Sequence, residues 1–425
     1  MGNYADYLAA LRTPFVKLCR LRFLNPDGST AFMVDNNPLN KLSSTFIASG
    51  ALSMNWQNGR RRSADVTMQN VNGSYDYNVN HVWFGSEIAL DMGLVLPDGS
   101  DFYIQQGVFL VESPEETVYP VNRTATLHLV DKVANLDGSL MGNLEGTYRV
   151  LAYNETQGET GEHIFSGTNI FEPIMALLSE DRGNGQPIDR VPPIFTNWYN
   201  GKTQLLPNGS TCFLTNVPYD LDVDTTKWDV ILGLCEMLAA WVGYDESGAL
   251  RIDPSQDDIA DGDKPIAWEF STDEAQILGA TYTAQNTEVY NDYIVVGEKL
   301  SDNTMPCGRA ENFDDASDTN INLIGRKTYR ESGAKYFSDW QCVSKANWML
   351  KRSAILKKSV SISCTQMFHI HGNDIVTLRR TDKPGSPVER HLVTGFSIPL
   401  AGTQAMTIDC TSVADLPFAT LTSGD

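Results

Sequence analysis

Short runs of alternating apolar and polar residues, separated by turn signals, constrain the fold of this 425-residue chain more than any other feature. In the first third of the chain they recur at the spacing of about 8–12 residues that is typical of β-sandwiches and barrels. We interpret as strands the segments 16–24, 31–34, 52–56, 64–68, 88–92, 102–105, 108–111 and 125–130. The sequence therefore predicts a barrel or sandwich for this part of the chain.

The clearest of these signals is a hairpin. Alternating residues before and after Asn58-Gly59 are apolar: Leu52, Met54, Trp56, Ala64, Val66 and Met68. Asn-Gly between two such runs predicts a two-residue turn with positive φ at Gly59. Arg60–Arg62 follow it. They could form a nucleic-acid patch, but the acidity of the chain favours a solvated hairpin tip.

The stretch 226–253 predicts the clearest long helix. Its apolar residues fall at helical steps on one face: Trp228, Ile231, Leu232, Cys235, Leu238 and Val242. Thr226 and Asp229 form a plausible capping pair, and Gly243 supplies the stop. A turn at Ser247-Gly248 then leads into a strand.

The remaining segments are assigned by the same criteria. We expect short helices at 3–12 and 171–179, the second inside a looser segment, 149–225, and a further helix at 339–356. Residues 301–320 read as an acidic polar loop. Expected strands lie at 289–297, 359–365, 374–380, 390–396 and 405–410.

Composition excludes several classes of protein. Lys and Arg number 32 against 53 Asp and Glu, so the net charge of −21 argues against nucleic-acid binding over the bulk of the surface. No apolar run approaches the ~20 residues of a membrane span, and the N-terminus lacks a secretion signal. Seven cysteines without a Cys-x-x-Cys motif indicate reduced, buried thiols.

No motif for catalysis or nucleotide binding occurs. His369 and His371 would share one face of a strand as metal ligands, but a polar strand end before the turn at Gly372-Asn373 is the favoured interpretation. The acidic stretch 253–263 invites a calcium site, yet its spacing fails the EF-hand pattern and favours a solvated loop. We predict no catalytic, cofactor-binding or metal residues, and no enzymatic activity.

Several turn and strand segments follow one another in a distinctive order. They run from Gly50-Ala-Leu-Ser through Gly59-Arg-Arg to Val66-Thr-Met-Gln-Asn-Val-Asn-Gly73, then to Tyr244-Asp-Glu-Ser-Gly-Ala-Leu-Arg-Ile252 and Tyr290-Asn-Asp-Tyr-Ile-Val-Val-Gly297. They end with His371-Gly-Asn-Asp-Ile-Val-Thr-Leu378, His391-Leu-Val-Thr-Gly-Phe396 and Gln404-Ala-Met-Thr-Ile-Asp-Cys410. In this order they resemble the baseplate-hub or tail-tip proteins of tailed bacteriophages.

The resemblance implies a mainly β, multidomain fold with α+β parts, which contains two tail-tube-like β-barrel domains. We expect a first tube-like domain at 1–148, an insertion domain at 149–225, a middle helix-and-strand domain at 226–270 and a second tube-like domain at 271–415. Residues 416–425 would be a loose tail.

The resemblance also implies a structural function. Three copies would form a ring that joins a hexameric tail tube to the tip and lines the DNA path, with DNA passing without specific binding. Partners would be the tail tube protein, the distal tail protein and tip or fibre proteins. The chain would be made in the host cytoplasm and reside in the virion tail.

Two other functions remain open. A glycan- or receptor-binding module is conceivable because Trp198, Tyr199 and Tyr219 could stack on sugars. A cell-wall hydrolase is the third possibility, although no carboxylate pair stands out.

Overall fold

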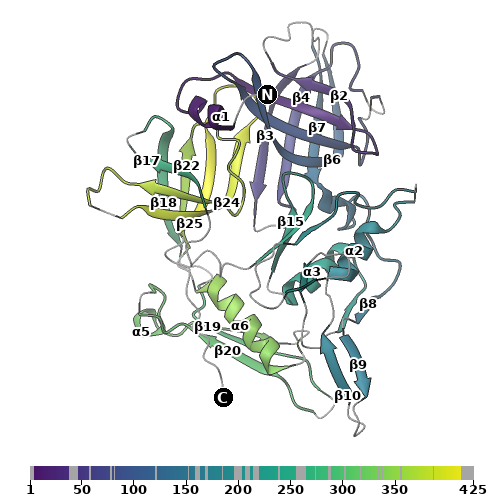
Figure 1. Ribbon diagram of the computed structural model, residues 1–425, viewed down its shortest axis with the longest axis vertical. Coiled ribbons are helices and arrows are strands. Elements are labelled where there is room, and N and C mark those ends of the chain that lie inside the picture. Colours follow the sequence, from purple (N-terminus) through teal and green to yellow (C-terminus); the bar gives the residue numbers. More distant parts are fainter. Residues whose placement is uncertain are drawn as a thin grey trace.

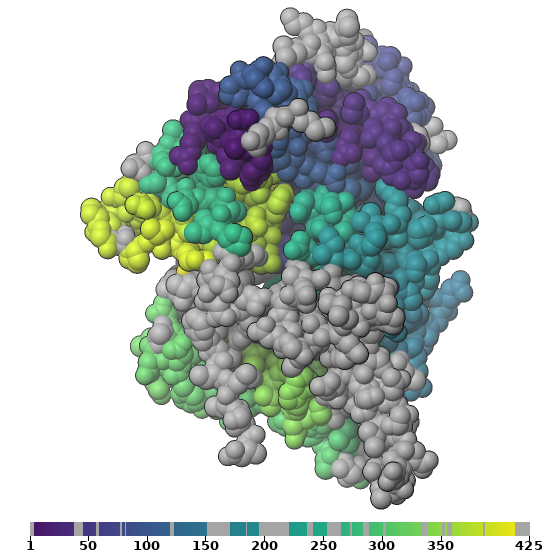
Figure 2. All heavy atoms as spheres, in the orientation of Figure 1, coloured from purple at the N-terminus to yellow at the C-terminus, as the bar shows by residue number. Residues whose placement is uncertain are grey.

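The computed structural model arranges the chain around one large sheet, with smaller units below it (Figure 1). In the space-filling view the C-terminal strands, in yellow, lie against the purple and blue N-terminal part (Figure 2). The structure describes residues 4–37, 46–56, 59–76, 79–80, 82–119, 122–151, 153–157, 163–167, 171–183, 185–195, 203–205, 211–213, 220–237, 240–254, 265–272, 274–285, 289–300, 303–315, 317–332, 336, 338–354, 357–385 and 387–412.

Strands from both ends of the chain build the large sheet. The N-terminal part supplies β1 (Lys17–Leu24), β2 (Thr30–Asp35), β3 (Ile47–Asn55), β4 (Arg62–Gln69), β5 (Glu87–Val95), β6 (Asp101–Tyr119) and β7 (Asn122–Asp131). The C-terminal part supplies β17 (Ile266–Ser271), β18 (Ile277–Gln285), β22 (Lys357–Cys364), β23 (Ile375–Arg379), β24 (Glu389–Pro399) and β25 (Met406–Ser412). The main path runs β18-β22-β25-β24-β3-β4-β7-β6-β5-β1-β2.

The pairing of β24 with β3 joins the two parts. It is antiparallel, with Phe396 opposite Met54 and Ile398 opposite Leu52. All four side chains are buried in one hydrophobic core that spans both parts of the sheet. Alternation along the strands puts one set of side chains in this core and the other set on the opposite face.

The β3–β4 hairpin is confirmed, but its predicted two-residue turn is wrong. The strands pair as far as Met54 and Arg62, which leaves a loop of several residues between them. Gly59 does not adopt positive φ, and Asn58 lies outside the described residues. A longer loop is required because Trp56 is buried and the Trp56 N–H donates to Thr394 O at 2.7 Å instead of continuing the hairpin.

A second hydrophobic core lies beside the large sheet. It is formed by α2 (Phe171–Ser179), α3 (Lys227–Met237), the 3-10 turn η1 (Lys132–Asn135) and the hairpin of β15 (Ala240–Tyr244) and β16 (Leu250–Pro254). The capping pair at the start of α3 is confirmed. Thr226 Oγ1 accepts from Asp229 N at 3.1 Å, and Asp229 Oδ2 accepts from Thr226 N at 3.1 Å.

The predicted length of this helix is wrong, because α3 ends at Met237. Val242 is buried from strand β15, which pairs antiparallel with β16, so Gly243 is a strand residue and not a helix stop. Pairing with β16 overrides the helical spacing, as tertiary contacts commonly do. Trp228, Ile231 and Cys235 are buried as expected, Leu232 is half-buried, and Leu238 lies outside the described residues.

A third core belongs to a small α/β unit at the bottom of Figure 1. Helix α6 (Asp339–Ser353) packs on β19 (Asp292–Val296) and β20 (Cys307–Glu311), and β21 (Thr328–Ser332) completes the sheet. The predicted polar loop 301–320 therefore contains a strand, because Gly308 and Ala310 alternate toward the helix.

Short elements complete the described chain. The short helices are α1 (Tyr4–Ala10) and α5 (Ile321–Ile324). The short strands are β8 (Tyr148–Leu151), β9 (Tyr153–Gln157), β10 (His163–Gly167), β11 (Ile194–Phe195), β12 (Thr203–Leu205), β13 (Thr211–Phe213) and β14 (Asp220–Val223).

The mainly β, multidomain class with α+β parts is confirmed. The boundaries at 1–148, 149–225, 226–270, 271–415 and 416–425 remain predictions. Within the described ranges, no helix combines the length and the apolar character that a membrane span requires.

Candidate functional site

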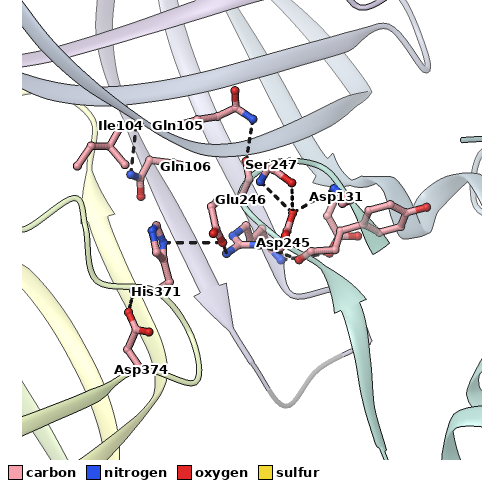
Figure 3. A network of polar contacts seen from close by, with 12 residues as sticks. Ile104, Gln105, Gln106, Asp131, Asp245, Glu246, Ser247, His371 and Asp374 are labelled. Atoms are coloured by element: carbon pink, nitrogen blue, oxygen red, sulfur yellow. Dashed lines mark hydrogen bonds and ion pairs between the residues drawn. The ribbon is translucent and has the colours of Figure 1, made fainter. Parts of the chain in front are cut away.

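A buried cluster of charges lies where the large sheet meets the second core (Figure 3). Five segments contribute: the end of the β3–β4 loop, the start of η1, the segment between α2 and β11, the β15–β16 turn and the loop 365–374 between β22 and β23. We call it the charged junction and define it by Arg61, Arg62, Asp131, Lys132, Asp189, Glu246 and His371.

Asp131 ties the β3–β4 loop to η1. It caps η1 by accepting from Val133 N at 3.1 Å on Oδ1, and its Oδ2 accepts from Arg61 N at 2.6 Å. The Arg62 N–H adds a longer bond of 3.3 Å. Burial raises the pKa of Asp131 to about 6, although these N–H donors act in the opposite direction.

Arg62 connects β4 to the β15–β16 turn. Its guanidinium is buried and donates to Tyr244 O at 2.7 Å and to Glu246 Oε2 at 3.2 Å. Burial lowers the pKa of Arg62, while nearby carboxylates partly offset this effect. Burial would raise the pKa of Glu246, but His371 and Arg62 outweigh it and lower that pKa.

Arg61 packs its guanidinium 3.5 Å from the centroid of the Trp56 ring, a cation–π contact. Its side chain is buried, and strand β15 makes room for it at Gly243. A Cβ at position 243 would overlap the guanidinium of Arg61. The glycine is therefore explained by close packing.

A second buried ion pair, between Lys132 and Asp189, lies beside the Tyr244 ring. Lys132 Nζ also donates to Gly248 O at 3.0 Å and lies 5.1 Å from the Tyr244 ring centroid. Both partners are almost fully buried, so the Lys132 ammonium has a carboxylate and a carbonyl partner away from solvent.

Strand β6 and the loop 365–374 close the junction. Gln105 Nε2 donates to Glu246 O at 2.8 Å, and Gln106 Nε2 donates to Phe368 O at 2.7 Å. Figure 3 shows His371 directed toward Glu246, 4.0 Å away. These contacts connect β6, the β15–β16 turn and the loop 365–374. The arrangement is typical of a structural contact between parts of a fold and not of a reaction centre.

The arginine triplet was misjudged from the sequence. Arg61 and Arg62 are buried, which contradicts both the nucleic-acid patch and the solvated hairpin tip. Arg60 pairs with Asp137 at 2.6 Å and Glu112 at 3.1 Å. The partners of the triplet are Asp131, Asp137 and Glu246. They are distant from it in the sequence, so no local pattern could indicate these contacts.

The two histidines do not form a pair of metal ligands, and the predicted polar strand end is also wrong. Both lie in a loop, and His369 is buried with its Nδ1 3.0 Å from Tyr7 Oη. Burial lowers the pKa of His369 to about 4. Within the described segments, no group of three or more His, Cys, Asp or Glu side chains could hold a metal ion.

Other sequence candidates lie outside the described residues. These are the acidic residues 257–263 with the side chain of Asp253, and the aromatic residues Trp198, Tyr199 and Tyr219. The calcium and sugar-stacking hypotheses stay untested.

Comparison with solved structures places the fold among phage tail proteins. A tail protein from Neisseria meningitidis MC58 matches 94% of this chain and 99% of its own, with a TM-score of 0.60 and 8% identity. The 43 kDa tail protein of prophage MuSo2 from Shewanella oneidensis matches 94% of this chain and 100% of its own (TM-score 0.59, 10% identity). The prophage tail protein gp18 from Listeria monocytogenes covers 93% and 94% (TM-score 0.52, 8% identity).

No protein-family model matches the chain, and no curated protein matches its sequence. The resemblance inferred from the sequence is thus confirmed at the level of the fold. The fold extends over nearly the whole chain and not over one domain only.

Proposed function

We propose that the chain is a non-enzymatic structural protein of a phage-type tail, located at its baseplate or tip. The observation that carries the proposal is the end-to-end correspondence with two tail proteins, each of which is matched over almost its full length.

The ring architecture belongs to the same proposal. Three copies would form a ring around the DNA path, between the tail tube and the tip, with the tail tube protein, the distal tail protein and tip or fibre proteins as partners. The charged junction supports such a role because its ion pairs and hydrogen bonds fix the second core against the large sheet. A subunit whose parts are fixed in this way keeps its shape within a ring.

A binding module is the second candidate and a cell-wall hydrolase the third. The described residues favour neither, since Asp131 and Asp189, which are buried, and Glu246, which is partly buried, are held by arginine, lysine and backbone N–H groups. A hydrolytic carboxylate pair instead needs open access to the substrate on both sides of the scissile bond.

Light scattering on the purified protein tests the ring directly. A trimer has a mass of about 141 kDa, three times the 47.0 kDa of one chain. A monomer at high micromolar concentration, together with release of fragments from cell-wall preparations, would favour the hydrolase instead.

A further inference from the structure

The ion pair of Lys132 and Asp189 places an amine and a carboxyl group in contact inside the protein. Only 1% of the Lys132 side chain is exposed, and none of the Asp189 side chain. Lys132 opens η1, directly after β7 of the large sheet, and Asp189 follows Ile188 of the second core. The pair therefore connects two parts of the fold at a point that solvent does not reach.

Neighbouring groups hold both members of the pair in place. Lys132 Nζ contacts Asp189 Oδ1 and donates to Gly248 O at 3.0 Å. Asp189 Oδ1 also accepts from Val191 N at 2.9 Å, and Asp189 N donates to Leu178 O at 2.9 Å. Because the side chain and the backbone of Asp189 are both anchored, the nitrogen of Lys132 stays next to the carboxyl group.

Tyr244 encloses the pair further. The Lys132 nitrogen lies 5.1 Å from the centroid of the Tyr244 ring. Burial and the charge of Asp189 raise the pKa of the Tyr244 hydroxyl well above its ordinary value. The hydroxyl therefore stays protonated, and it adds no second negative charge beside the carboxyl group.

The interior offers this ion pair a neutral alternative. An ammonium and a carboxylate that are removed from water lose the hydration that stabilises their charges. Transfer of one proton from Lys132 to Asp189 leaves an amine beside a carboxylic acid, and both charges disappear. An amine and a carboxylic acid are the two groups that condense to an amide.

We propose that Lys132 and Asp189 form an intramolecular isopeptide bond. The amine nitrogen of Lys132 attacks the carboxyl carbon of Asp189, and the new C–N bond replaces one C–O bond. The released oxygen leaves as water, with one proton from the carboxylic acid and one from the amine. The reaction consumes no oxidant and no cofactor, and it ties the end of β7 covalently to the segment between α2 and β11.

Contact and the absence of bulk water favour this condensation. Two groups that a fold holds in reactive contact behave as if their concentration were up to about 10⁵–10⁸ M. Exclusion of water suppresses the reverse reaction, hydrolysis of the amide. The Val191 N–H donates to the oxygen on which negative charge develops during the attack, and this contact stabilises the transition state.

Mass spectrometry of the denatured, reduced protein tests the bond. Wild type is compared with Lys132→Arg, which has no amine to condense, so that any other processing of the chain cancels. The mass difference between the two should exceed the difference of their sequences by one water molecule. In the tryptic digest of wild type, cleavage after Lys132 should be lost, and the segment 124–149 should appear joined to the segment 183–190.

Lys227 and Glu180 provide a matched control within the same chain. They also form an ion pair in direct contact, but 42% of the Glu180 side chain is exposed. Water hydrates these charges, so the charged form persists and no amide should form. Trypsin should therefore cleave after Lys227 as it does after an unmodified lysine.

The wild-type digest decides the proposal even if Lys132→Arg does not fold. Normal cleavage after Lys132, or absence of the branched peptide, overturns the isopeptide bond. Loss of one water with cleavage after Lys132 intact would indicate a succinimide at an Asp-Gly sequence such as Asp137-Gly138, and it overturns the bond as well. These measurements use the single chain, so their outcome does not depend on the proposed ring.

Discussion

At the scale of single residues, two arginines of the charged junction, Arg61 and Arg62, are buried. Arg62 is buried with Glu246 and Tyr244 O, so Arg62→Ala leaves both acceptors without their cation. The loss should destabilise the fold by roughly 2–4 kcal/mol, in the lower part of the range for broken buried pairs, because Glu246 keeps some solvent contact. Urea unfolding measures the change.

Arg60 provides the matched control for this prediction. Its two ion pairs are partly exposed, with 35% of its side chain accessible, and such pairs contribute less than about 1 kcal/mol. If Arg60→Ala and Arg62→Ala shift the unfolding midpoint equally, burial at the junction is not the deciding factor.

The raised pKa of Asp131 predicts a pH dependence. Between the unfolded pKa, near 4, and the folded pKa of about 6, the folded state binds more protons than the unfolded state. The contribution of Asp131 therefore favours folding at low pH, and it is lost as pH rises through about 6. The lost stability amounts to roughly 3 kcal/mol by linkage, an upper estimate for one group.

Asp131→Asn isolates this effect from other titrating groups. The unfolding free energies of wild type and variant should be compared at pH 4.5 and pH 7. The wild type should lose stability relative to the variant as pH rises between these values. A difference between the two proteins that stays constant with pH would show that Asp131 does not titrate in this range.

The sequence could not reveal these roles, for a physical reason. A run of three arginines after a turn has the same local pattern whether it is solvated or buried. The outcome was decided by Asp131 and Glu246, which approach Arg62 only in the folded chain. By contrast, the Thr226–Asp229 cap was predictable because both partners lie within one helical turn.

At the scale of elements, α3 offers a direct test of core packing. Leu234 is fully buried in the second core, so Leu234→Ala should destabilise the protein by about 2–5 kcal/mol. Leu232, two residues earlier, is only half-buried, and Leu232→Ala should cost clearly less. Equal shifts of the urea midpoint for both variants would place the helix in a different rotation.

Periodicity predicted where most elements lie but misjudged two of their ends. Helix α2 has the predicted limits, and the hairpin partners β3 and β4 pair as expected. The end of α3 was missed because Val242 continues the helical spacing while its backbone pairs with β16. The turn at Gly59 was missed because Trp56 leaves the hairpin to bond with Thr394.

At the scale of the whole molecule, one sheet joins two segments that the sequence analysis assigned to separate domains. The segments 1–148 and 271–415 were expected as two tube-like domains, and the β24–β3 pair links their strands edge to edge over one core. Local patterns carry no information about such a pairing, since both strands would alternate in the same way with any partner. By contrast, the order of the turn and strand motifs did predict the similarity of the whole fold to phage tail proteins.

A shared core predicts shared stability. Ile398 lies on β24, is fully buried and faces Leu52 on β3. Ile398→Ala should therefore speed amide hydrogen exchange in β3 and β4 as well as in β24 and β25, because the truncation removes about 2–5 kcal/mol from a core common to both parts. Mass spectrometry of peptic fragments resolves the four strands.

Val295 supplies the comparison, since it is fully buried in the separate core of β19, β20 and α6. Val295→Ala should speed exchange in that unit and leave β3 and β4 unchanged, because cooperative opening follows contiguous packing. Faster exchange confined to β24 and β25 in the Ile398 variant would mean that the two segments unfold independently in spite of the pairing. The expected domain boundary between them would then hold for stability, although one sheet crosses it.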